Sequence, residues 1–202
     1  MGRTSDAKAN LLDAAIELIW SHSYGTVSVD QICEQAGVKK GSFYHFFPSK
    51  VDLALAACEQ HWNLEVQPIL DEIFRADVPP RERLLKWCEA IYIEQKAKFD
   101  ATGHVPGCPL CSLGAEMSTQ SERLRAKTEE LLERGAYHLE RALRDGMRDG
   151  SLPDNDSAVQ ARALSTFLMG AMLQAKLHND PEVLRELPRH ADRLPDGVIE
   201  RG

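Results

Sequence analysis

The sequence predicts an all-α protein, and three observations lead to that fold class. Apolar side chains recur at helical spacing along most of the chain. No segment shows the strict alternation of apolar and polar residues that is typical of a half-buried strand. Serine, aspartate and proline residues stand where the predicted helices would begin. We expect an N-terminal three-helix domain over residues 1–50 and a larger helical domain over residues 51–202.

The first three helices have recognisable start and stop signals. Apolar residues at helical spacing form one face of the first helix: Leu11, Leu12, Ala15, Leu18 and Ile19. This helix is expected to end near the segment SHSYG, with Gly25 as its C-terminal glycine. A capping box of Ser28 and Gln31 starts the second helix. The third runs over residues 40–46, and Pro48 prevents its continuation.

The fourth helix begins with a second capping box, formed by Ser49 and Asp52. It is expected to run through Trp62 and to be kinked or broken by Pro68. Pro80 then occupies the first turn of a further helix, because proline is tolerated where the N–H group has no partner in the helix.

The rest of the chain continues as helices joined by short loops. A loop that contains HVPG leads into a short helix, and a long amphipathic helix follows and closes at Gly150. The segment PDNDSAVQARALSTFLMGAMLQAKLH is the next helix. In DPEVLREL, Asp180 is the predicted N-cap and Pro181 the first helical residue. The tail after Pro188 is polar and is expected to be loose.

Charge is distributed unevenly between the two predicted domains. Residues 1–50 contain five Lys/Arg and five Asp/Glu, whereas residues 51–202 contain nineteen and twenty-six, which accounts for the net charge of −7. Phosphate binding requires positive charge, so the larger domain is a poor candidate for holding nucleic acid. Five cysteines, no secretory signal and no apolar run of membrane-spanning length predict a cytoplasmic protein that contacts no membrane.

The stretch AGVKKGSFYHFFPSK, residues 36–50, contains three lysines, four aromatic residues and no acid. It joins a short helix to a second short helix through a turn, and Gly37 allows that turn to be tight. This is the helix-turn-helix arrangement, whose second helix enters the major groove of DNA. An acid on that surface would face phosphate at short range, which explains why the stretch has none.

The aromatic residues of this stretch divide by spacing. Phe43, Phe46 and Phe47 share one helix face and are predicted to be core. The residues predicted to contact DNA lie off that face or at helix starts: Ser28, Lys39, Lys40, Gly41, Ser42, Tyr44, His45 and Lys50. The alternative for the charges alone is an ordinary solvated surface.

The segment TVSVDQICEQAGVKKGSFYHFFPSKVDL, residues 26–53, resembles the DNA-binding signature of the TetR family of transcriptional regulators. The matching positions are Ser28, Ile32, Ala36, Gly37, Val38, Gly41, Tyr44, Phe47, Ser49, Lys50 and Leu53. Lys39 departs from the family, which often has a small hydroxyl residue there, and Cys33 stands where alanine is frequent. The resemblance implies a homodimer on a palindromic double-stranded DNA operator, a small-molecule inducer bound by the larger domain and, most commonly, repression.

The segment ALSTFLMGAMLQAKL is apolar around most of its helical circumference. Such a helix must be buried on two sides, and a second copy of the chain would supply the second side. The residues predicted at this dimer interface, together with two leucines of the following segment, are Leu164, Phe167, Leu168, Ala171, Met172, Ala175, Leu184 and Leu187. The alternative is a core helix of a monomer.

Large side chains of the middle helices are candidates for the wall of a ligand pocket. With one cysteine they are Trp62, Trp87, Tyr92, Phe99, Cys108, Met117 and Tyr137. Each of them could equally be plain core. If they line a cavity, the ligand is largely apolar.

The segment HVPGCPLCSL places Cys108 at a predicted helix N-cap and Cys111 in the first turn, where a thiolate is stabilised. Three interpretations compete. The two cysteines belong to a pocket wall, or Cys108 reacts with an electrophile or oxidant and Cys111 resolves it. In the third, His104, Cys108 and Cys111 bind a metal ion, with Cys58 or His61 as a fourth ligand. A lone Cys-x-x-Cys disfavours metal, so we expect neither a metal ion nor a cofactor.

An enzyme is the remaining class to consider. A dithiol oxidoreductase needs a strand before its Cys-x-x-Cys motif, and GHVPG is not a strand. No phosphate-binding loop, dinucleotide fingerprint or nucleophile elbow occurs. The sequence therefore predicts a DNA-binding regulator that has no catalytic residues.

Overall fold

The computed structural model describes residues 2–192, with side chains from residue 6 onward. Within this range the chain forms helices and no strands, so the all-α prediction is confirmed. None of the described helices is both long enough and apolar enough to cross a bilayer.

The chain divides into two compact units that do not follow a single cut in the sequence. The head unit comprises the residues up to Gln67 together with Pro109–Leu131. The C-terminal unit comprises Pro68–Cys108 and the chain from Leu132 onward. The helix that follows Cys108 therefore belongs to the same unit as the predicted helix-turn-helix.

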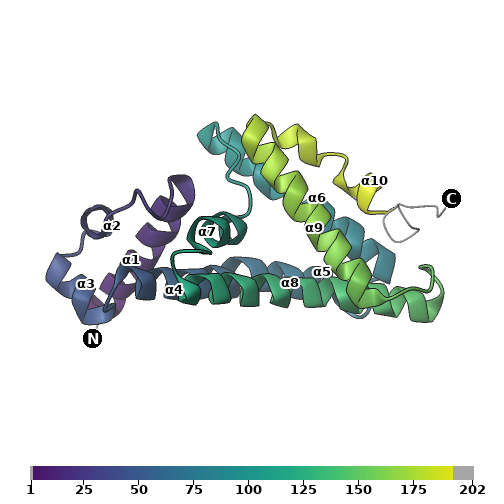
Figure 1. Ribbon diagram of the computed structural model, residues 1–202, viewed down its shortest axis with the longest axis horizontal. Helices are drawn as coiled ribbons and strands as arrows, with labels where there is room; N and C mark the ends of the chain where they lie inside the picture. The colour runs from purple at the N-terminus through teal and green to yellow at the C-terminus, as the bar shows by residue number, and fades with distance from the viewer. Residues whose placement is uncertain (1, 193–202) are drawn as a thin grey trace. The chain divides into compact units, whose positions relative to one another are not determined.

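The head unit is built from α1 (Gly2–Ser21), α2 (Val29–Gln35), α3 (Lys40–Phe46), α4 (Lys50–His61), α7 (Pro109–Met117) and the first part of α8 (Glu122–Asp149). Helix α1 packs against α2, α3, α4 and α7, as can be followed in Figure 1. The core of the head unit is apolar and includes the fully buried side chains of Leu11, Ile32, Phe43 and Leu53. The buried side chain of Phe43 anchors α3, a short helix that would be only marginally stable by itself.

Most local signals of the head act as predicted. Ser28 and Gln31 form the reciprocal capping box at the start of α2, and Gly37 adopts a left-handed φ of 63° in the turn before α3. The prediction for Gly25 is wrong: α1 already ends at Ser21, and the φ of Gly25 is not in the left-handed region. Space, rather than backbone conformation, constrains this glycine, as described below.

Pro68 does not end the helical path. Helix α4 ends at His61, one residue before the predicted Trp62, and continues as a π-helical turn over Trp62–Val66 into α5 (Gln67–Ile73). Pro68 lies in the first turn of α5. The wider π turn shifts the hydrogen-bond register before the proline, and single π turns of this kind are a known accommodation of an irregular helix.

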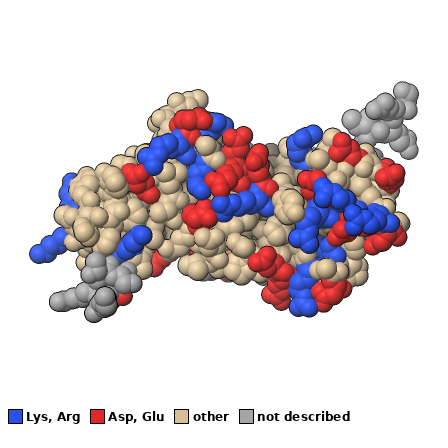
Figure 2. Space-filling view, turned by 90° about the horizontal axis from the view of Figure 1, so that it is seen from below, with Lys and Arg blue, Asp and Glu red and all other residues tan. Residues whose placement is uncertain are grey.

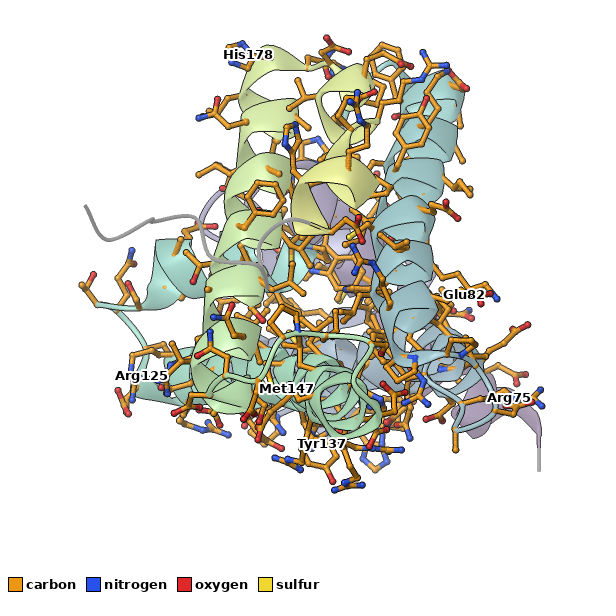
Figure 3. All side chains as sticks on the ribbon, turned by 90° about the vertical axis from the view of Figure 1, so that its right-hand side faces the viewer. Arg75, Glu82, Arg125, Tyr137, Met147 and His178 are labelled. Carbon is orange, nitrogen blue, oxygen red and sulfur yellow. The ribbon has the colours of Figure 1, made fainter. Side chains whose placement is uncertain are left out.

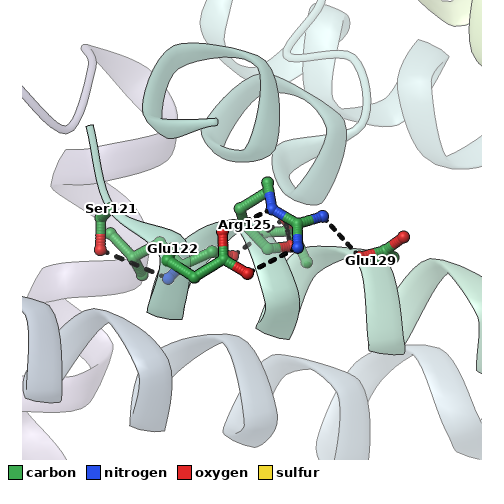
Figure 4. A network of polar contacts seen from close by, with 6 residues as sticks. Ser121, Glu122, Arg125 and Glu129 are labelled. Carbon is green, nitrogen blue, oxygen red and sulfur yellow. Dashed lines mark hydrogen bonds and ion pairs between the residues drawn. The ribbon is translucent and has the colours of Figure 1, made fainter. Parts of the chain in front are cut away.

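The start of α8 is held by charges on its exposed face. The Ser121 hydroxyl accepts a hydrogen bond from the backbone N–H of Leu124. The Arg125 guanidinium donates to Glu122 at 2.6 Å and to Glu129 at 2.7 Å, as Figure 4 shows. Such pairs along one helix each contribute about 0.3–0.5 kcal/mol.

The C-terminal unit contains α5, α6 (Pro80–Thr102), the rest of α8, α9 (Ser157–His178), the 3-10 turn η2 (Pro181–Leu184) and α10 (Leu187–Ala191). Pro80 at the first helical position and Gly150 with its left-handed φ of 79° are as predicted. Acidic and basic side chains lie interspersed on the face drawn in Figure 2.

Two predictions near the C-terminus are only partly right. Asp180 does cap the next element, but that element is a short 3-10 turn instead of an α-helix. The chain just after Pro188 is not loose, because α10 buries Leu187 and Ala191 and packs against α6. The polar residues of this helix stay at the surface while these two apolar ones anchor it. The rest of the predicted loose tail lies outside the described residues.

A buried arginine ties two helices of this unit together. Arg83 of α6 is 3% exposed, and its guanidinium donates to Asp145 of α8 at 2.8 Å. It also donates to the backbone carbonyls of Val78 and Ala76. Because these partners satisfy three of its nitrogen atoms, they offset part of the desolvation cost of burying the charge.

Candidate functional site

Helix α3 separates an inward face from an outward face within seven residues. Phe43 is fully buried and Phe47, at its C-cap, is 4% exposed, whereas Tyr44 is 52% exposed and His45 is also exposed. Phe46 is only half-buried, so the predicted three-residue core face is anchored mainly by the other two phenylalanines. A helix that enters a DNA groove needs an exposed face for the duplex and a buried face that anchors it, and α3 has both.

The N-terminal end of α3 presents the predicted contact residues to solvent. Lys39, Lys40 and Gly41 are exposed, and Ser42 is half-buried. The ammonium of Lys40 pairs with Asp30 of α2 at 2.8 Å, and this hydrogen-bonded partner raises the pKa of Lys40. An exposed pair of this kind contributes little to stability. Phosphate can therefore replace Asp30 as the partner of Lys40 at small cost.

Ser28 caps α2 from an exposed position. Its hydroxyl accepts the N–H of Gln31 at 3.2 Å and donates to the Gln31 side chain at 2.9 Å. Its own N–H donates to the same side-chain oxygen at 2.8 Å. The first turn of α2 is thus fixed at the place where a helix N-terminus can meet a phosphate oxygen.

Lys50 has a role inside the head that the sequence did not indicate. Its ammonium donates to the backbone carbonyls of Tyr24 at 2.6 Å and Val27 at 2.7 Å. It also lies 4.0 Å from the centre of the Tyr24 ring, a cation–π contact. Burial lowers the pKa of Lys50, and the charge of Glu116 opposes that shift. Contact of Lys50 with phosphate stays a prediction.

The five cysteines fall into two groups by burial, and none is part of a disulfide. Burial raises the pKa of the Cys58 and Cys88 thiols to about 12, and burial with nearby Asp30 raises that of Cys33. Cys108 and Cys111 are half-exposed and lie just before and within the first turn of α7. The two cysteines singled out in the sequence are thus the accessible ones.

The loop that carries Cys108 is fixed on two sides by other elements of the C-terminal unit. The buried side chain of Gln95 accepts the N–H of Gly107 at 2.9 Å and donates to its carbonyl at 3.4 Å. Gly107 adopts a left-handed φ of 69°, and a Cβ there would lie 3.1 Å from Cδ of Lys176 on α9. A lysine of α9 therefore packs directly beside the residue that precedes Cys108.

The metal interpretation finds no geometric support. In the part of the chain that the structure describes, no three His, Cys, Asp or Glu side chains cluster as metal ligands. His104 is exposed, and its backbone N–H donates to the Thr102 hydroxyl at 3.3 Å.

The predicted pocket residues are divided between the units. Trp62 and Met117 are buried in the head unit, while Trp87, Tyr92, Phe99 and Cys108 are half-buried in the C-terminal unit. The Tyr92 hydroxyl donates to Glu182 at 3.1 Å. Tyr137 is 55% exposed, and Figure 3 shows its side chain pointing outward from α8. A role in ligand binding remains a prediction for all seven.

The predicted dimer residues also have different environments. Five of them are buried within the single chain: Leu164, Leu168, Ala175, Leu184 and Leu187. Phe167, Ala171 and Met172 are half-buried. Sequence reasoning missed Leu173 and Leu177, which are 56% and 70% exposed one helical turn apart on α9. These two leucines lie opposite the buried face of α9, and this position could have identified them. Because α9 is apolar on both faces, periodicity did not show which face is exposed.

Comparison with known proteins gives concordant results for both halves of the chain. The family described as "Bacterial regulatory proteins, tetR family" matches residues 11–57, and "Tetracyclin repressor-like, C-terminal domain" matches residues 80–191. The transcriptional regulator AcuR of Cereibacter sphaeroides is 31% identical over 185 residues, which are 91% of this chain and 82% of that protein. The transcriptional repressor NemR of Escherichia coli K12 is 27% identical over 190 residues, 94% of each chain.

Solved structures agree. The crystal structure of the reduced form of E. coli NemR superposes with a TM-score of 0.78 at 26% identity and covers 93% of this chain and 96% of that one. The crystal structure of a regulatory protein TetR from Rhodobacter sphaeroides superposes with a TM-score of 0.80 at 30% identity and covers 93% of this chain and 98% of that one. The helix-turn-helix geometry, the two family matches and these full-length likenesses together establish that the chain belongs to the TetR family of helix-turn-helix transcriptional regulators.

Proposed function

We propose that this protein is a transcriptional repressor that binds a palindromic DNA operator as a homodimer and is released by a small molecule acting on its C-terminal part. The observation that carries the proposal is α3, where buried Phe43 fixes a helix that exposes Tyr44 and His45 next to Lys39. Two such helices one turn of DNA apart would read a symmetric site. The role is regulation without catalysis.

The dimer has support in the exposed apolar residues of α9. Leu173 and Leu177 form one ridge, and a Cβ added at Gly170 would meet nothing within 4 Å. A second copy of α9 could approach closely there. Exposed leucines in such a row favour a protein partner over solvent.

A second function is favoured by the cysteines: release triggered by an electrophile at Cys108. Cys108 and Cys111 are the accessible thiols, whereas burial raises the pKa of the other three thiols above its ordinary value. The thiolate of Cys108 would add to an activated carbon–carbon double bond: an S–C bond forms, the π bond breaks and the neighbouring carbon takes a proton from water. The similar NemR crystal structure is described as that of a reduced form.

Both functions can be tested with one set of titrations. Operator duplexes are selected from a random library with the purified protein, and binding is followed by fluorescence anisotropy before and after treatment with N-ethylmaleimide. We expect treatment to weaken binding in the wild type and in Cys88→Ser but not in Cys108→Ser. Peptide mapping should show Cys108 labelled before Cys33, Cys58 and Cys88. Equal labelling rates, or the same loss of binding in Cys108→Ser, would contradict the thiol function. If the selection yields no operator sequence, the proposal that this protein is a DNA-binding repressor is contradicted.

A further inference from the structure

The turn between α1 and α2 is held by a side chain from a distant part of the sequence. Glu116 of α7 accepts hydrogen bonds from two successive backbone N–H groups, Tyr24 at 3.0 Å and Gly25 at 2.7 Å. Each bond uses a different carboxylate oxygen, so the group is engaged at both atoms. Hydrogen bonds to an ionised acceptor are roughly twice as strong as neutral ones. The contact lies wholly within the head unit.

The same turn is held from its carbonyl side by Lys50. Glu116 satisfies the N–H groups of the turn, and Lys50 satisfies the carbonyls of Tyr24 and Val27. The Tyr24 side chain is 7% exposed, so the turn is also packed. A segment without regular structure is thereby given a defined position by two opposite charges.

Gly25 fits this arrangement for a steric reason. Its backbone is not left-handed, yet a Cβ at this position would lie 3.0 Å from Oε1 of Glu116. A side chain here would push against the carboxylate that bonds the neighbouring amide. The close approach of Glu116 therefore accounts for the glycine that the sequence suggested as a helix terminus.

The turn leads directly into the DNA-contacting helices, so its position contributes to theirs. Three residues after Gly25, Ser28 caps α2, and α2 is joined to α3 by the tight turn at Gly37. At the other end of the link, α7 begins at the residue after Cys108 and contains Cys111. A movement of α7 would therefore pull on the turn through the Glu116 carboxylate.

We propose that Glu116 is a positioning residue that fixes the α2–α3 pair relative to α7 and so connects events at the start of α7 to DNA binding. The coupling part rests on the proposed function, because it takes the event to be reaction at Cys108. The positioning part does not depend on the proposed function. Two independent measurements on one variant separate the two parts.

The first measurement is operator affinity of the unmodified protein. Glu116→Gln leaves one carbonyl acceptor and turns an amide N–H₂ toward the second backbone N–H, so the turn loosens. We expect binding to weaken about fivefold or more, with the dimer intact by native mass spectrometry. Glu129→Gln is the matched control, because Glu129 contacts Arg125 on α8 and does not reach the turn. Glu116→Gln with wild-type affinity would overturn the positioning role.

The second measurement is the ratio of dissociation constants with and without N-ethylmaleimide on Cys108. A merely structural role of Glu116 would change stability and leave this ratio unchanged. We expect the ratio to fall toward one in Glu116→Gln and to keep its wild-type value in Glu129→Gln. Weaker binding with an undiminished ratio would overturn the coupling and leave the positioning. A ratio of one in the wild type would refute thiol-triggered release, and the affinity of unmodified Glu116→Gln would then decide the positioning role alone.

Gly25→Ala gives a check that leaves Glu116 in place. The added methyl group would lie 3.0 Å from the carboxylate oxygen, and we expect the shift of the glutamate that relieves this contact to lengthen its bonds to the turn. We therefore expect Gly25→Ala to weaken operator binding and to lower the ratio of dissociation constants, each by less than Glu116→Gln does. Wild-type affinity together with a wild-type ratio in Gly25→Ala and Glu116→Gln would contradict the whole inference.

Discussion

Helices α3 and α9 both carry exposed side chains over a buried anchor, but the exposed groups differ in kind. Helix α3 has seven residues and exposes a tyrosine, a histidine and two nearby lysines over Phe43. Helix α9 has 22 residues and exposes Leu173 and Leu177 over buried Leu164 and Leu168. Aromatic hydroxyl and ammonium groups suit phosphate and base edges, whereas a leucine ridge suits another apolar surface. This difference supports the proposal that α3 meets DNA and α9 meets a second copy of the chain.

The anchor matters more for the short helix than for the long one. Seven residues make too few hydrogen bonds to hold a helix in water, so α3 depends on its packing. In the 22-residue α9, several buried side chains share the packing that holds the helix in place. The following predictions test this contrast in order of expected effect.

Phe43→Ala should have the largest effect. Removing a fully buried phenylalanine costs about 3–5 kcal/mol, and α3 has no other side chain buried so completely. We expect specific DNA binding to be lost and chemical unfolding to begin at lower denaturant concentration. Phe46→Ala, at a half-buried site on the same helix, serves as the control and should cost clearly less. Equal losses in the two variants would show that α3 is not anchored as described.

Leu173→Glu combined with Leu177→Glu should dissociate the dimer and leave the subunit folded. Hot-spot residues at protein interfaces contribute about 2 kcal/mol or more each, and an acid in place of an exposed leucine costs the isolated chain little. Sedimentation velocity should show monomers with an unchanged helical circular dichroism spectrum. Ile93→Glu makes the same change at an exposed residue of α6 and should keep the wild-type subunit number. A dimer that survives the double change would place the interface elsewhere.

Tyr44→Ala should weaken operator binding without weakening the fold. Contacts to base edges or phosphate contribute about 1–3 kcal/mol, so we expect a loss of roughly tenfold to a hundredfold by anisotropy. The melting temperature should stay near that of the wild type, because the side chain is exposed. Tyr137→Ala, at a tyrosine of similar exposure on α8, should bind DNA normally. Parallel losses of stability and affinity would assign Tyr44 to the core.

The smallest expected effect concerns acid sensitivity of the C-terminal unit. Burial lowers the pKa of His138 below its ordinary value of 6.5, and Arg141 adds to the shift while Asp71 opposes it. The unfolded chain then binds the proton more readily, so stability falls as the pH drops through 6.5 toward the lowered pKa. Urea unfolding at about pH 7.5 and about pH 5.5, on either side of the ordinary histidine pKa, should show a smaller difference in His138→Gln than in the wild type or in exposed His104→Gln. The same pH dependence in all three would exclude His138 as the source.

The capping box of α2, the turn at Gly37 and the end of α3 before Pro48 could be predicted because their signals are local. A capping box, a left-handed glycine and a proline stop act within four or five residues, and the sequence displays them directly. Gly25 shows the limit of this reasoning. It was expected to end a helix, but its neighbour is Glu116, 91 residues away in sequence.

The C-terminal unit was less predictable because its functional residues depend on which face is buried. Helix α9 is apolar on both sides, so periodicity could not separate buried Leu164 from exposed Leu173. The pocket candidates were chosen by size, and size does not distinguish half-buried Trp87 from exposed Tyr137. The place of Cys108 and Cys111 at a helix start suggested a stabilised thiolate, and the structure adds that these two thiols are partly exposed while the other three are buried.

Native mass spectrometry of the protein with its selected operator duplex, before and after N-ethylmaleimide, tests the central claim most directly. It reports chains per duplex and the modification state in one spectrum. We predict two chains on one duplex before treatment, and free duplex with a dimer carrying label at Cys108 afterward. A single chain on the duplex would contradict the palindromic dimer, and a fully labelled dimer that remains bound would contradict release through the start of α7.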